Sequence, residues 1–563
     1  MQKGSGSAQE VEYRYPPWVR RYIDIPEESV YDAFALSVKE NSGRPAVYFL
    51  GRRMTYSELG EYVDAMAEIL RDQGVSRGSR VMVLMPNVPH YIVTFFACMK
   101  LGAVVVQANP LYTVRELSYE LSDSGSSTLV TVDIVAGRLK GLDLSGVRVL
   151  VLDTMDFLPG GKAMLFPLSR QGREARGSLK ALGLRTVRIR VGRNGPPEKV
   201  DPAKHPALIQ YTGGTTGMPK GAVLSHRNLV ANAYQIIEWL PEKYRKHTSY
   251  LSAAPFFHVY GMMTAMLLPL IQGATMYLVP DPRDTGMIVD YLERFGPTAF
   301  PGIPTMYHSI VSRKDISARK INRVKVCISG AMPLPVELQK RFEEVTGATL
   351  VEGYGLSECS PVANVTPIVE EDRDSWRRPG SVGLPLPSTE ERIVSLADPD
   401  RDVPLGEEGE LLIRGPQVML GYWNREDETR EVLRDGWLHT GDIARMDSDG
   451  YVYIVGRKKE LIIASGYNVY PREVEDVIYQ NPKVAQCAVI GVPDEHRGET
   501  VKAVIVPKDR SLTADEVIGF CRERLAAYKV PRIVEFRDSL PMTAVGKVDK
   551  LRLKQEYLGK NGG

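Results

Sequence analysis

The chain has 563 residues, of which 43% are hydrophobic and 25% are charged, and its formal net charge at pH 7 is +2. This composition is typical of a folded globular protein, and the length indicates two to four structural units. The small net charge excludes a global electrostatic bias toward nucleic acid or toward acidic partners. The five cysteines contain no C-x-x-C pair, which indicates neither a metal cage nor a disulfide framework and favours a reducing cytosol.

Two segments are candidates for a membrane or export signal. Residues 1–7 lack the apolar stretch of a secretory signal. The most apolar longer stretch, residues 261–280, is interrupted by Thr, Gln, Gly and Pro, so it is predicted to be a buried helix followed by a strand rather than a membrane span. We therefore expect a cytoplasmic protein, with peripheral membrane contact left open.

Helix and strand patterns alternate along the first part of the chain. An amphipathic helix is expected near residues 30–39, followed by a strand at 80–85, a helix at 91–101 and a strand at 102–106. Strand, helix, strand is typical of a parallel α/β sheet. Further predicted strands lie at 127–132, 149–152, 274–279, 299–300 and 324–328. This predicts two α/β subdomains, at about 45–205 and about 206–380.

The pattern changes after about residue 380. Pro and Gly become frequent and short strands such as 410–414 alternate with turns, which predicts a small, barrel-like antiparallel β unit at about 381–457. A compact α+β module follows, with strands near 488–490 and 501–506. The main boundary is predicted at 457–459. Residues 1–457 would then form a large N-terminal domain and residues 458–563 a small, mobile C-terminal domain.

One segment has a local charge imbalance. Residues 161–200 carry ten Lys and Arg against two Asp and Glu. The favoured interpretation is a solvated loop. The alternative is contact with anionic membrane lipid, which contributes up to about 1 kcal/mol per basic residue near the surface.

The stretch from Tyr211 to Gly221 has the composition of a polyphosphate-binding loop. It reads Tyr-Thr-Gly-Gly-Thr-Thr-Gly-Met-Pro-Lys-Gly. Glycines allow backbone N–H groups to converge on an anion, threonine hydroxyls add donors, and Lys220 adds a positive charge. The spacing is not that of a Walker A loop, because Lys220 is followed by glycine rather than by Ser or Thr. A Gly/Thr-rich surface turn is the alternative.

This loop resembles the phosphate loop of the adenylate-forming superfamily, which includes acyl-CoA synthetases, coumarate ligases, luciferases and peptide-synthetase adenylation domains. Five further motifs follow in the order of that family: Pro255–His258, Glu352–Glu358, Gly436–Asp442, Gly456–Lys459 and Gly546–Lys547. Within the family, the later half resembles bacterial long-chain fatty acid–CoA ligases most, through Leu350–Glu358, Gly415–Trp423 and Tyr528–Pro531. A single motif would be a weak signal, but six in order are specific.

The resemblance implies an ATP-dependent fatty acid–CoA ligase, which is an acid–thiol ligase. A carboxylate and ATP would give acyl-AMP and pyrophosphate, and the thiol of coenzyme A would then give acyl-CoA and AMP. The C-terminal domain would rotate between these half-reactions. The implied substrates are ATP, coenzyme A and a medium- to long-chain fatty acid, with Mg2+ as cofactor.

Several alternatives stay open at this point. The chain could be an adenylating enzyme that loads a carrier protein or another acceptor, or a ligase for aryl or other carboxylates. A non-catalytic lipid- or nucleotide-binding relative is a third reading, against which the retained Lys547, Glu358 and Asp442 argue. A homodimer is implied by resemblance alone, and no nucleic-acid partner is expected.

The resemblance also assigns roles to individual nucleotide-binding residues. The loop 212–220 would wrap the β- and γ-phosphates, Glu358 would hold Mg2+, and Asp442 would accept hydrogen bonds from the ribose hydroxyls. Arg457 would also reach the ribose. The predicted ATP- and AMP-binding residues are Thr212, Gly213, Gly214, Thr215, Thr216, Gly217, Lys220, Gly330, Ala331, Glu352, Gly353, Tyr354 (near adenine), Gly355, Ser357 (at the α-phosphate), Asp442, Arg457 and Lys547.

Lys547 matches the catalytic lysine of the family, which bridges the carboxylate and the α-phosphate. The predicted catalytic residues are Lys547, Glu358 and Thr212. The sequence after Gly546 reads Lys-Val-Asp-Lys-Leu-Arg, where relatives more often have Lys-Ile-x-Arg-Arg, but the lysine itself is retained.

The remaining assignments concern the acyl chain, coenzyme A and the hinge. His258, Val259, Tyr260, Met263 and Gly330 are predicted to line the acyl site. Methionine suits a channel for flexible chains, and it equally suits ordinary core packing. The predicted coenzyme A-binding residues are Ser465, Gly466 and Tyr467, and the predicted hinge is Lys459.

Overall fold

The computed structural model describes residues 11, 13–192, 195–212, 218–464, 467–494, 497–543 and 548–561. Several predicted site residues therefore lie outside the described residues, namely Gly213, Gly214, Thr215, Thr216, Gly217, Ser465, Gly466 and Lys547. Among the helices that are described, none is long and apolar enough to cross a membrane.

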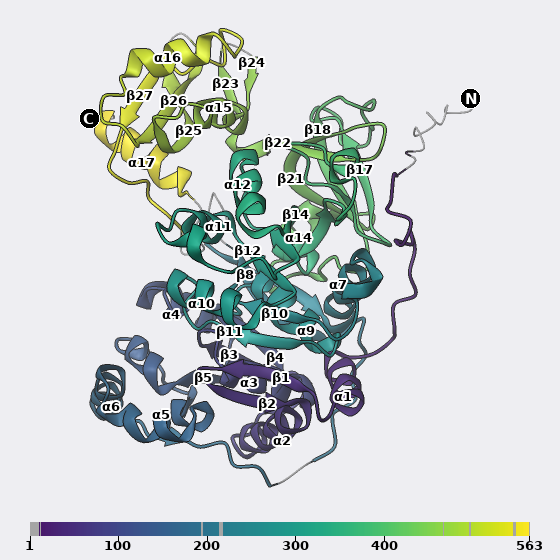
Figure 1. The fold of residues 1–563 in the computed structure, drawn as a ribbon, viewed down its shortest axis with the longest axis vertical. Coiled ribbons are helices and arrows are strands. Elements are labelled where there is room, and N and C mark those ends of the chain that lie inside the picture. The colour runs from purple at the N-terminus through teal and green to yellow at the C-terminus, as the bar shows by residue number, and fades with distance from the viewer. Residues whose placement is uncertain are drawn as a thin grey trace.

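The first large sheet is mostly parallel (Figure 1). Its strands are β3 (Arg80–Leu84), β4 (Val104–Ala108), β5 (Thr128–Val132), β6 (Arg148–Leu152), β7 (Thr186–Val187), β8 (Pro206–Thr212), β9 (Lys220–Ser225) and β19 (Gly421–Tyr422). Their spatial order is β19-β9-β8-β4-β3-β5-β6-β7. Only β9 and β19, at one edge, run antiparallel to their neighbours.

The second large sheet is also mainly parallel. Its strands are β1 (Pro45–Phe49), β2 (Arg52–Thr55), β10 (Ser249–Ser252), β11 (Thr275–Leu278), β12 (Ala299–Gly302), β13 (Val326–Ser329), β14 (Thr349–Gly355), β15 (Val362–Val365) and β16 (Leu384–Pro385). Their spatial order is β16-β15-β14-β13-β12-β10-β11-β1-β2.

The two sheets do not follow the predicted subdomain ranges of 45–205 and 206–380. β1 and β2 belong by sequence to the first range, but β1 pairs with β11 in the second sheet. Conversely, β8 and β9 begin the second range, but β8 pairs with β4 in the first sheet. Apolar runs specify strands, whereas the choice of neighbour depends on crossover connections that the hydrophobic pattern does not encode.

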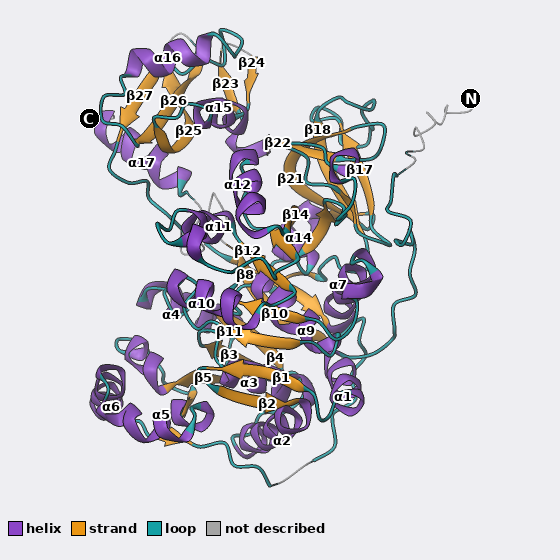
Figure 2. Ribbon diagram, in the orientation of Figure 1, coloured by secondary structure: helices purple, strands orange, loops and turns teal. Residues whose placement is uncertain are grey.

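Helices pack around both sheets, as Figure 2 shows. Those of the N-terminal part are α1 (Val30–Glu40), α2 (Tyr56–Asp72), α3 (Pro89–Lys100), α4 (Val114–Ser124), α5 (Gly160–Leu165), α6 (Arg170–Leu182), α7 (His226–Trp239), α8 (Val259–Met262), α9 (Leu268–Ile271), α10 (Thr285–Phe295), α11 (Pro304–Val311), α12 (Val336–Thr346), α13 (Arg373–Trp376) and α14 (Glu426–Val432). Local sequence explains where several begin. Ser29 and Thr55, for example, start α1 and α2 with capping boxes completed by Asp32 and Glu58.

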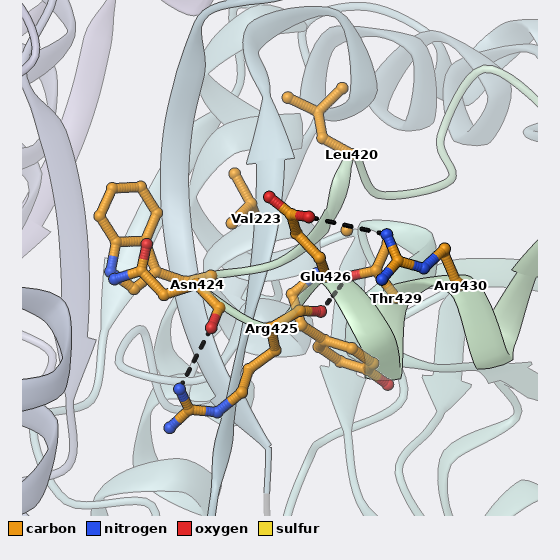
Figure 3. A pocket seen from close by; sticks show the side chains of 10 residues that line it. Val223, Leu420, Asn424, Arg425, Glu426, Thr429 and Arg430 are labelled. Carbon is orange, nitrogen blue, oxygen red and sulfur yellow. Dashed lines mark hydrogen bonds and ion pairs between the residues drawn. The ribbon is translucent and has the colours of Figure 1, made fainter.

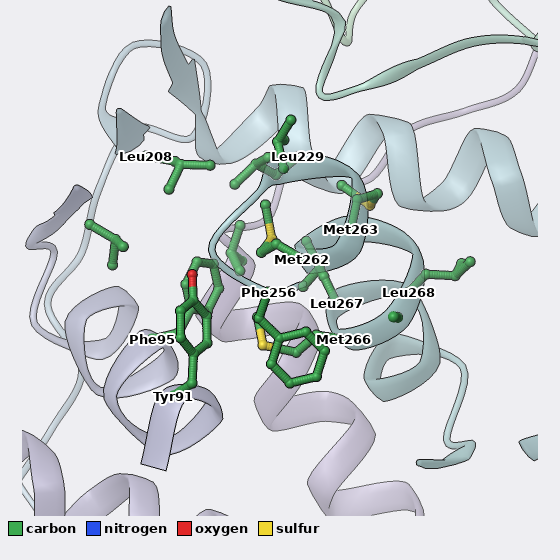
Figure 4. Packing of buried hydrophobic residues seen from close by; sticks show 14 of the residues in the cluster. Tyr91, Phe95, Leu208, Leu229, Phe256, Met262, Met263, Met266, Leu267 and Leu268 are labelled. Carbon is green, nitrogen blue, oxygen red and sulfur yellow. The ribbon is translucent and has the colours of Figure 1, made fainter. Parts of the chain in front are cut away.

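The apolar stretch 261–280 forms a buried helix and then a strand, as predicted. α8 continues through one π-helical turn, η5 (Met263–Leu267), into α9, and β11 follows. Figure 4 shows Met262, Met263 and Met266 packed with Phe95 and Phe256 in the main core. The segment is apolar on all sides because it is buried on all sides.

A smaller antiparallel sheet follows, as predicted for residues after 380. Its strands are β17 (Glu390–Val394), β18 (Gly409–Arg414), β20 (Leu433–Arg434), β21 (Trp437–Met446) and β22 (Val452–Arg457). The one-turn 3-10 helix η8 (Lys458–Glu460) connects β22 to the C-terminal part.

The C-terminal part has its own sheet and its own cores. Its elements are β23 (Ile462–Ala464), β24 (Tyr467–Val469), α15 (Pro471–Tyr479), β25 (Val484–Asp494), β26 (Gly498–Pro507), α16 (Ala514–Arg522), β27 (Ile533–Phe536) and α17 (Lys550–Asn561). Of the buried hydrophobic clusters formed by the described residues, two use only residues before 455 and two use only residues after 461. The change of core therefore coincides with η8. Figure 1 shows this part at the top of the view, above α12.

Candidate functional site

Several predicted site residues meet at the carboxyl edge of the second sheet. His258 follows β10, Gly330 follows β13, and Glu352 is the central residue of β14, whose second half continues the motif Glu352–Glu358. β10 lies between β11 and β12, so the chain leaves β10 and β12 in opposite directions. In open α/β sheets such a reversal of strand order leaves a crevice outside the carboxyl ends, where ligands bind.

The ends of the predicted phosphate loop are held by a hairpin. β8 and β9 pair antiparallel, with Thr212 opposite Lys220. The Thr212 hydroxyl donates a hydrogen bond of 3.4 Å to the backbone carbonyl of Lys220. The hairpin therefore fixes where the loop leaves and re-enters the sheet.

A second anchor of this loop comes from α4, which sequence reasoning missed. The Tyr119 hydroxyl donates to the carbonyl of Pro219 at 2.9 Å, and the Tyr211 hydroxyl donates to Asp123 Oδ2 at 2.7 Å. Asp123 Oδ1 also accepts a 2.8 Å hydrogen bond from Arg425 Nη2. α4 thus contacts the chain on both sides of the loop.

Arg425 also lines a pocket of about 480 Å³ (Figure 3). Its lining residues are Val223, Leu420, Gly421, Tyr422, Trp423, Asn424, Arg425, Glu426, Thr429 and Arg430. The pocket thus borders β9, the strand that follows the phosphate loop.

Tyr422 joins the phosphate loop to the predicted magnesium ligand. Its hydroxyl donates to Glu358 Oε1 at 2.8 Å, and the Lys220 ammonium lies 5.3 Å from the centre of its ring. Burial, and then the Glu358 carboxylate, raise the pKa of Tyr422, so the phenol stays protonated and donates. In the sequence, Tyr422 is only one member of the motif Gly415–Trp423, and no role was predicted for it.

Glu358 fits a magnesium ligand. It is half-buried in the short helix η7 (Ser357–Cys359). The Tyr422 side chain lies between it and Lys220, the lysine at the end of the predicted phosphate loop. Among the described residues no group of three or more acidic, His or Cys side chains could hold a metal ion by itself. Mg2+ commonly binds through one or two carboxylates together with phosphate oxygens and water, so a single carboxylate beside a phosphate loop suffices.

Asp442, Tyr354 and Arg457 form a second polar cluster. Asp442 is 3% exposed, accepts a 2.6 Å hydrogen bond from the Tyr354 hydroxyl, and pairs with Arg457 Nε at 3.0 Å. Burial, and then Asp442, raise the pKa of Tyr354, so the tyrosine remains a donor. Each carboxylate oxygen keeps a free lone pair in this arrangement, which is the capacity that a ribose diol requires.

The Glu352–Glu358 motif contains one position where only glycine fits. A Cβ atom at Gly355 would lie 1.8 Å from the carbonyl oxygen of Pro361. At Gly353, by contrast, a Cβ atom would meet only ordinary contacts. Burial raises the pKa of Glu352 to about 7, and Arg472 of α15 opposes this. Glu352 therefore lies within electrostatic reach of the C-terminal part.

Tyr260 and Gly330 are in direct contact. The Tyr260 hydroxyl donates to the carbonyls of Gly302 and Ile328, and a Cβ at Gly330 would lie 2.6 Å from its ring. The next residue, Ala331, has a left-handed backbone with φ of 65°. Glycine is thus required at 330, directly after β13, for the chain to pass this close to the Tyr260 ring.

The other predicted acyl-site residues have mixed surroundings. His258 caps α8, its Nδ1 accepting a 3.3 Å hydrogen bond from the backbone N–H of Tyr260, and it is half-buried. Val259 and Met263 are wholly buried in the main core. Their assignment to an acyl channel stays a prediction.

The predicted hinge lies between two residues whose ion pairs involve different parts of the chain. On one side, Lys458 Nζ contacts Glu410 Oε2 of β18 at 3.1 Å. On the other, Glu460 Oε2 contacts Lys550 Nζ of α17 at 3.0 Å. Lys459 lies between them and is exposed.

Two further features flank the predicted coenzyme A and catalytic residues of the C-terminal part. Tyr467 is exposed and stacks on Tyr528, with 4.8 Å between ring centres. Met542 and Val548 form an antiparallel bridge that closes the base of the segment containing Lys547. Lys547 itself lies outside the described residues.

Comparison with known proteins identifies the family. The AMP-binding enzyme model matches residues 34–423, and the model of the AMP-binding enzyme C-terminal domain matches residues 473–547. A long-chain-fatty-acid–CoA ligase of Bacillus subtilis (strain 168) is 39% identical over 557 residues, covering 96% of this chain and 98% of that protein. A ligase of the same name from Escherichia coli O6:H1 is 38% identical over 572 residues, with the same coverage.

A solved structure supports the same conclusion. The crystal structure of ATP-bound MatB from Rhodopseudomonas palustris matches with a TM-score of 0.79 and 28% identity, covering 94% of this chain and 99% of that one. The resemblance inferred from the six motifs is thereby confirmed. The chain belongs to the family of AMP-binding enzymes.

Proposed function

We propose that this chain is an ATP-dependent long-chain fatty acid–CoA ligase. The observation that carries the ATP-dependent part is the cluster in which Tyr422 joins Lys220 to Glu358. It brings a cation from the phosphate loop and a carboxylate suited to Mg2+ together at one place. The fatty acid and coenzyme A parts rest on the near full-length similarity to ligases of that name.

The first half-reaction requires two anions to approach each other. Lys220 and the loop would bind the β- and γ-phosphates, and Asp442 would orient the ribose. Glu358 would hold Mg2+, which neutralises charge on the pyrophosphate as it leaves. A carboxylate oxygen then attacks the α-phosphorus and the bond to the bridging oxygen breaks, while Lys547 stabilises the charge shared between the reacting groups.

The second half-reaction would use a different face of the C-terminal part. The thiolate of coenzyme A attacks the acyl carbon, and AMP leaves with the bonding electron pair. We propose that residues 458–563 turn about Lys459 between the two steps and present Tyr467 in place of the Lys547 segment. The ion pairs Lys458–Glu410 and Glu460–Lys550 support this position for the hinge, because each ties one side of Lys459 to a different part of the chain.

The preferred acid is assigned by class only. A chain buried in an apolar channel gains about 0.8 kcal/mol per CH2 group, so channel depth would set the preferred length. His258, Tyr260 and Gly330 stay our candidates for the channel entrance. A homodimer remains a proposal from resemblance alone.

The proposed division of labour is tested with the Lys547→Ala variant. ATP–pyrophosphate exchange in the presence of palmitate reports acyl-AMP formation, which this variant should lose by a factor of about 10²–10³ or more. Thioester formation from supplied palmitoyl-AMP and coenzyme A should stay near the wild-type rate. Equal loss of both activities would refute the assignment of the two steps to two faces.

A further inference from the structure

The segment α5–η3–α6 forms a distinct surface at one end of the molecule. It consists of α5, the 3-10 helix η3 (Phe166–Leu168) and α6. Figure 1 shows α5 and α6 at the end opposite the C-terminal part. We call this segment, together with the residues that follow α6 as far as 190, the basic hairpin.

The tip of the basic hairpin is apolar and exposed. Met164 is 75% exposed, Leu168 is 68% exposed and Leu165 is 60% exposed. Met164 and Leu168 are the two most exposed large hydrophobic side chains of the described chain. Three such side chains within five residues form an apolar patch, whereas scattered single ones would need no explanation.

The rest of the basic hairpin is strongly cationic. Residues 160–190 contain eight Lys and Arg and one acidic residue, Glu174, which pairs with Arg170. Arg188 pairs with Asp153 and Asp156 outside the segment, so the other six basic side chains carry its excess charge. Two of the arginines lie directly at the tip, because Arg173 donates to the carbonyl of Leu168 and Arg176 donates to the carbonyl of Pro167. Lys180 and Arg185 are exposed further along the same segment.

We propose that the basic hairpin docks this enzyme on an anionic lipid bilayer. Apolar side chains beside a cationic helix match the two layers of a membrane interface. Met164, Leu165 and Leu168 would enter the acyl boundary, and the arginines would contact the phosphate headgroups. Charge complementarity favours this occupant over a second copy of the chain, whose own hairpin carries the same positive charge.

The placement agrees with the proposed reaction. The basic hairpin shares no residue with the cluster of Lys220, Tyr422 and Glu358, and it lies at the end away from the part expected to rotate. Docking through it would hold the enzyme at a source of apolar acids while the C-terminal part stays free to move. The proposal extends the fatty acid assignment but does not depend on it, because membrane binding requires no turnover.

The test is co-sedimentation of the full chain with vesicles of phosphatidylcholine alone or mixed with phosphatidylglycerol. The wild-type chain should bind the anionic vesicles, with binding weakened by added salt. The variant Met164→Ser/Leu165→Ser/Leu168→Ser should bind at least about tenfold more weakly. The variant Lys180→Glu/Arg185→Glu should lose binding to anionic vesicles while keeping the apolar tip.

Matched controls distinguish binding through the basic hairpin from binding through exposed apolar side chains elsewhere on the molecule. Leu36→Ser and Leu558→Ser remove exposed leucines elsewhere and should leave vesicle binding unchanged. All variants should form acyl-CoA from dissolved octanoate at the wild-type rate if the ligase assignment holds, so that assignment and the docking proposal fail separately. The proposal is overturned if the wild-type chain does not bind anionic vesicles or if the triple variant binds as well as the wild type. A triple variant that keeps vesicle binding but changes from dimer to monomer would assign the patch to a second copy instead.

Discussion

Asp442 and Arg457 face each other across the antiparallel pair of β21 and β22, and their side chains form an ion pair of 3.0 Å. Arg457 is the last residue of β22, and the next residue begins η8. The proposed ribose ligand is therefore joined to the proposed hinge through one arginine.

Replacing Asp442 with Asn should weaken ATP binding. The variant keeps the shape of the side chain but removes the charge that pairs with Arg457, and hydrogen bonds to charged groups contribute about 1.5–3 kcal/mol. We expect kcat/KM for ATP to fall about 10–100-fold, with KM for coenzyme A unchanged. Tyr354→Phe, which removes one donor to Asp442, should show a smaller loss. An unchanged KM for ATP in the Asp442→Asn variant would contradict the ribose assignment.

Replacing Glu358 with Gln should raise the Mg2+ concentration needed for half-maximal activity. The amide lacks the charge that a hard cation prefers, and loss of one electrostatic contact to the leaving group should lower kcat by about 10²–10³-fold. Tyr422→Phe is the matched variant, because it keeps the Glu358 carboxylate and removes only its hydrogen bond. Its Mg2+ dependence should shift less. Identical Mg2+ titrations for the wild type and Glu358→Gln would argue against Glu358 as the ligand.

Replacing Lys459 with Pro should separate the two half-reactions. Proline fixes φ and removes the backbone N–H, so it restricts the residue that would absorb the rotation. Acyl-AMP formation, measured by pyrophosphate exchange, should be retained, while transfer to coenzyme A should fall. Lys459→Ala keeps backbone freedom and serves as the control, with both steps near wild type. Coenzyme A transfer at the wild-type rate in Lys459→Pro would exclude this residue as the hinge.

Glu391 should make stability depend on pH. The residue is 8% exposed, and burial raises the pKa of its carboxyl to about 8, with Asn364 donating to Oε2 at 3.1 Å and partly offsetting the shift. An unfolded glutamate has a pKa of about 4.3. Between the unfolded and the folded pKa, the folded chain therefore binds more protons than the unfolded chain. The contribution of Glu391 to the free energy of unfolding is therefore complete below the unfolded pKa and is lost as pH rises through the folded pKa.

The variant Glu391→Gln mimics the protonated acid and tests this. Its Tm should exceed that of the wild type at about pH 8, and the difference should vanish toward about pH 5. Glu390→Gln is the control, because Glu390 is half-exposed and pairs with Arg414, so its effect should stay within about 1 kcal/mol. A Tm difference for Glu391→Gln that does not vary with pH would contradict the raised pKa.

Periodicity predicted individual elements well. The helix expected near 30–39 is α1, and the apolar runs near 80–85 and 127–132 are β3 and β5. It could not predict that β1 pairs with β11, or that β19 pairs with β9, which lies far earlier in the sequence. These pairings depend on crossover paths, whereas periodicity reports only which face of an element is buried.

The candidate site was predicted through motifs, and its connecting residues were not. Asp442 and Tyr354 belong to different motifs, and in the structure the Tyr354 hydroxyl lies 2.6 Å from Asp442 Oδ2. Tyr422 lies within a motif but its contact with Glu358 was not predicted, and Asp123 lies in no motif. Their roles arise from hydrogen bonds to residues far away in the chain. For the segment α8–η5–α9, which contains Met262, Met263 and Met266, the sequence predicted the helix but not its role. Flexible apolar side chains suit a channel and a core equally.

Mass spectrometry of the reaction products tests the proposed long-chain fatty acid–CoA ligase activity most directly. The reactions contain ATP, Mg2+ and one of a panel of acids from acetate to stearate, including cinnamates, with and without coenzyme A. We expect acyl-CoA and AMP together when coenzyme A is present, with a maximum among the longer fatty acids, and acyl-AMP without it. Accumulation of acyl-AMP despite coenzyme A, or a preference for cinnamates, would contradict the proposed activity.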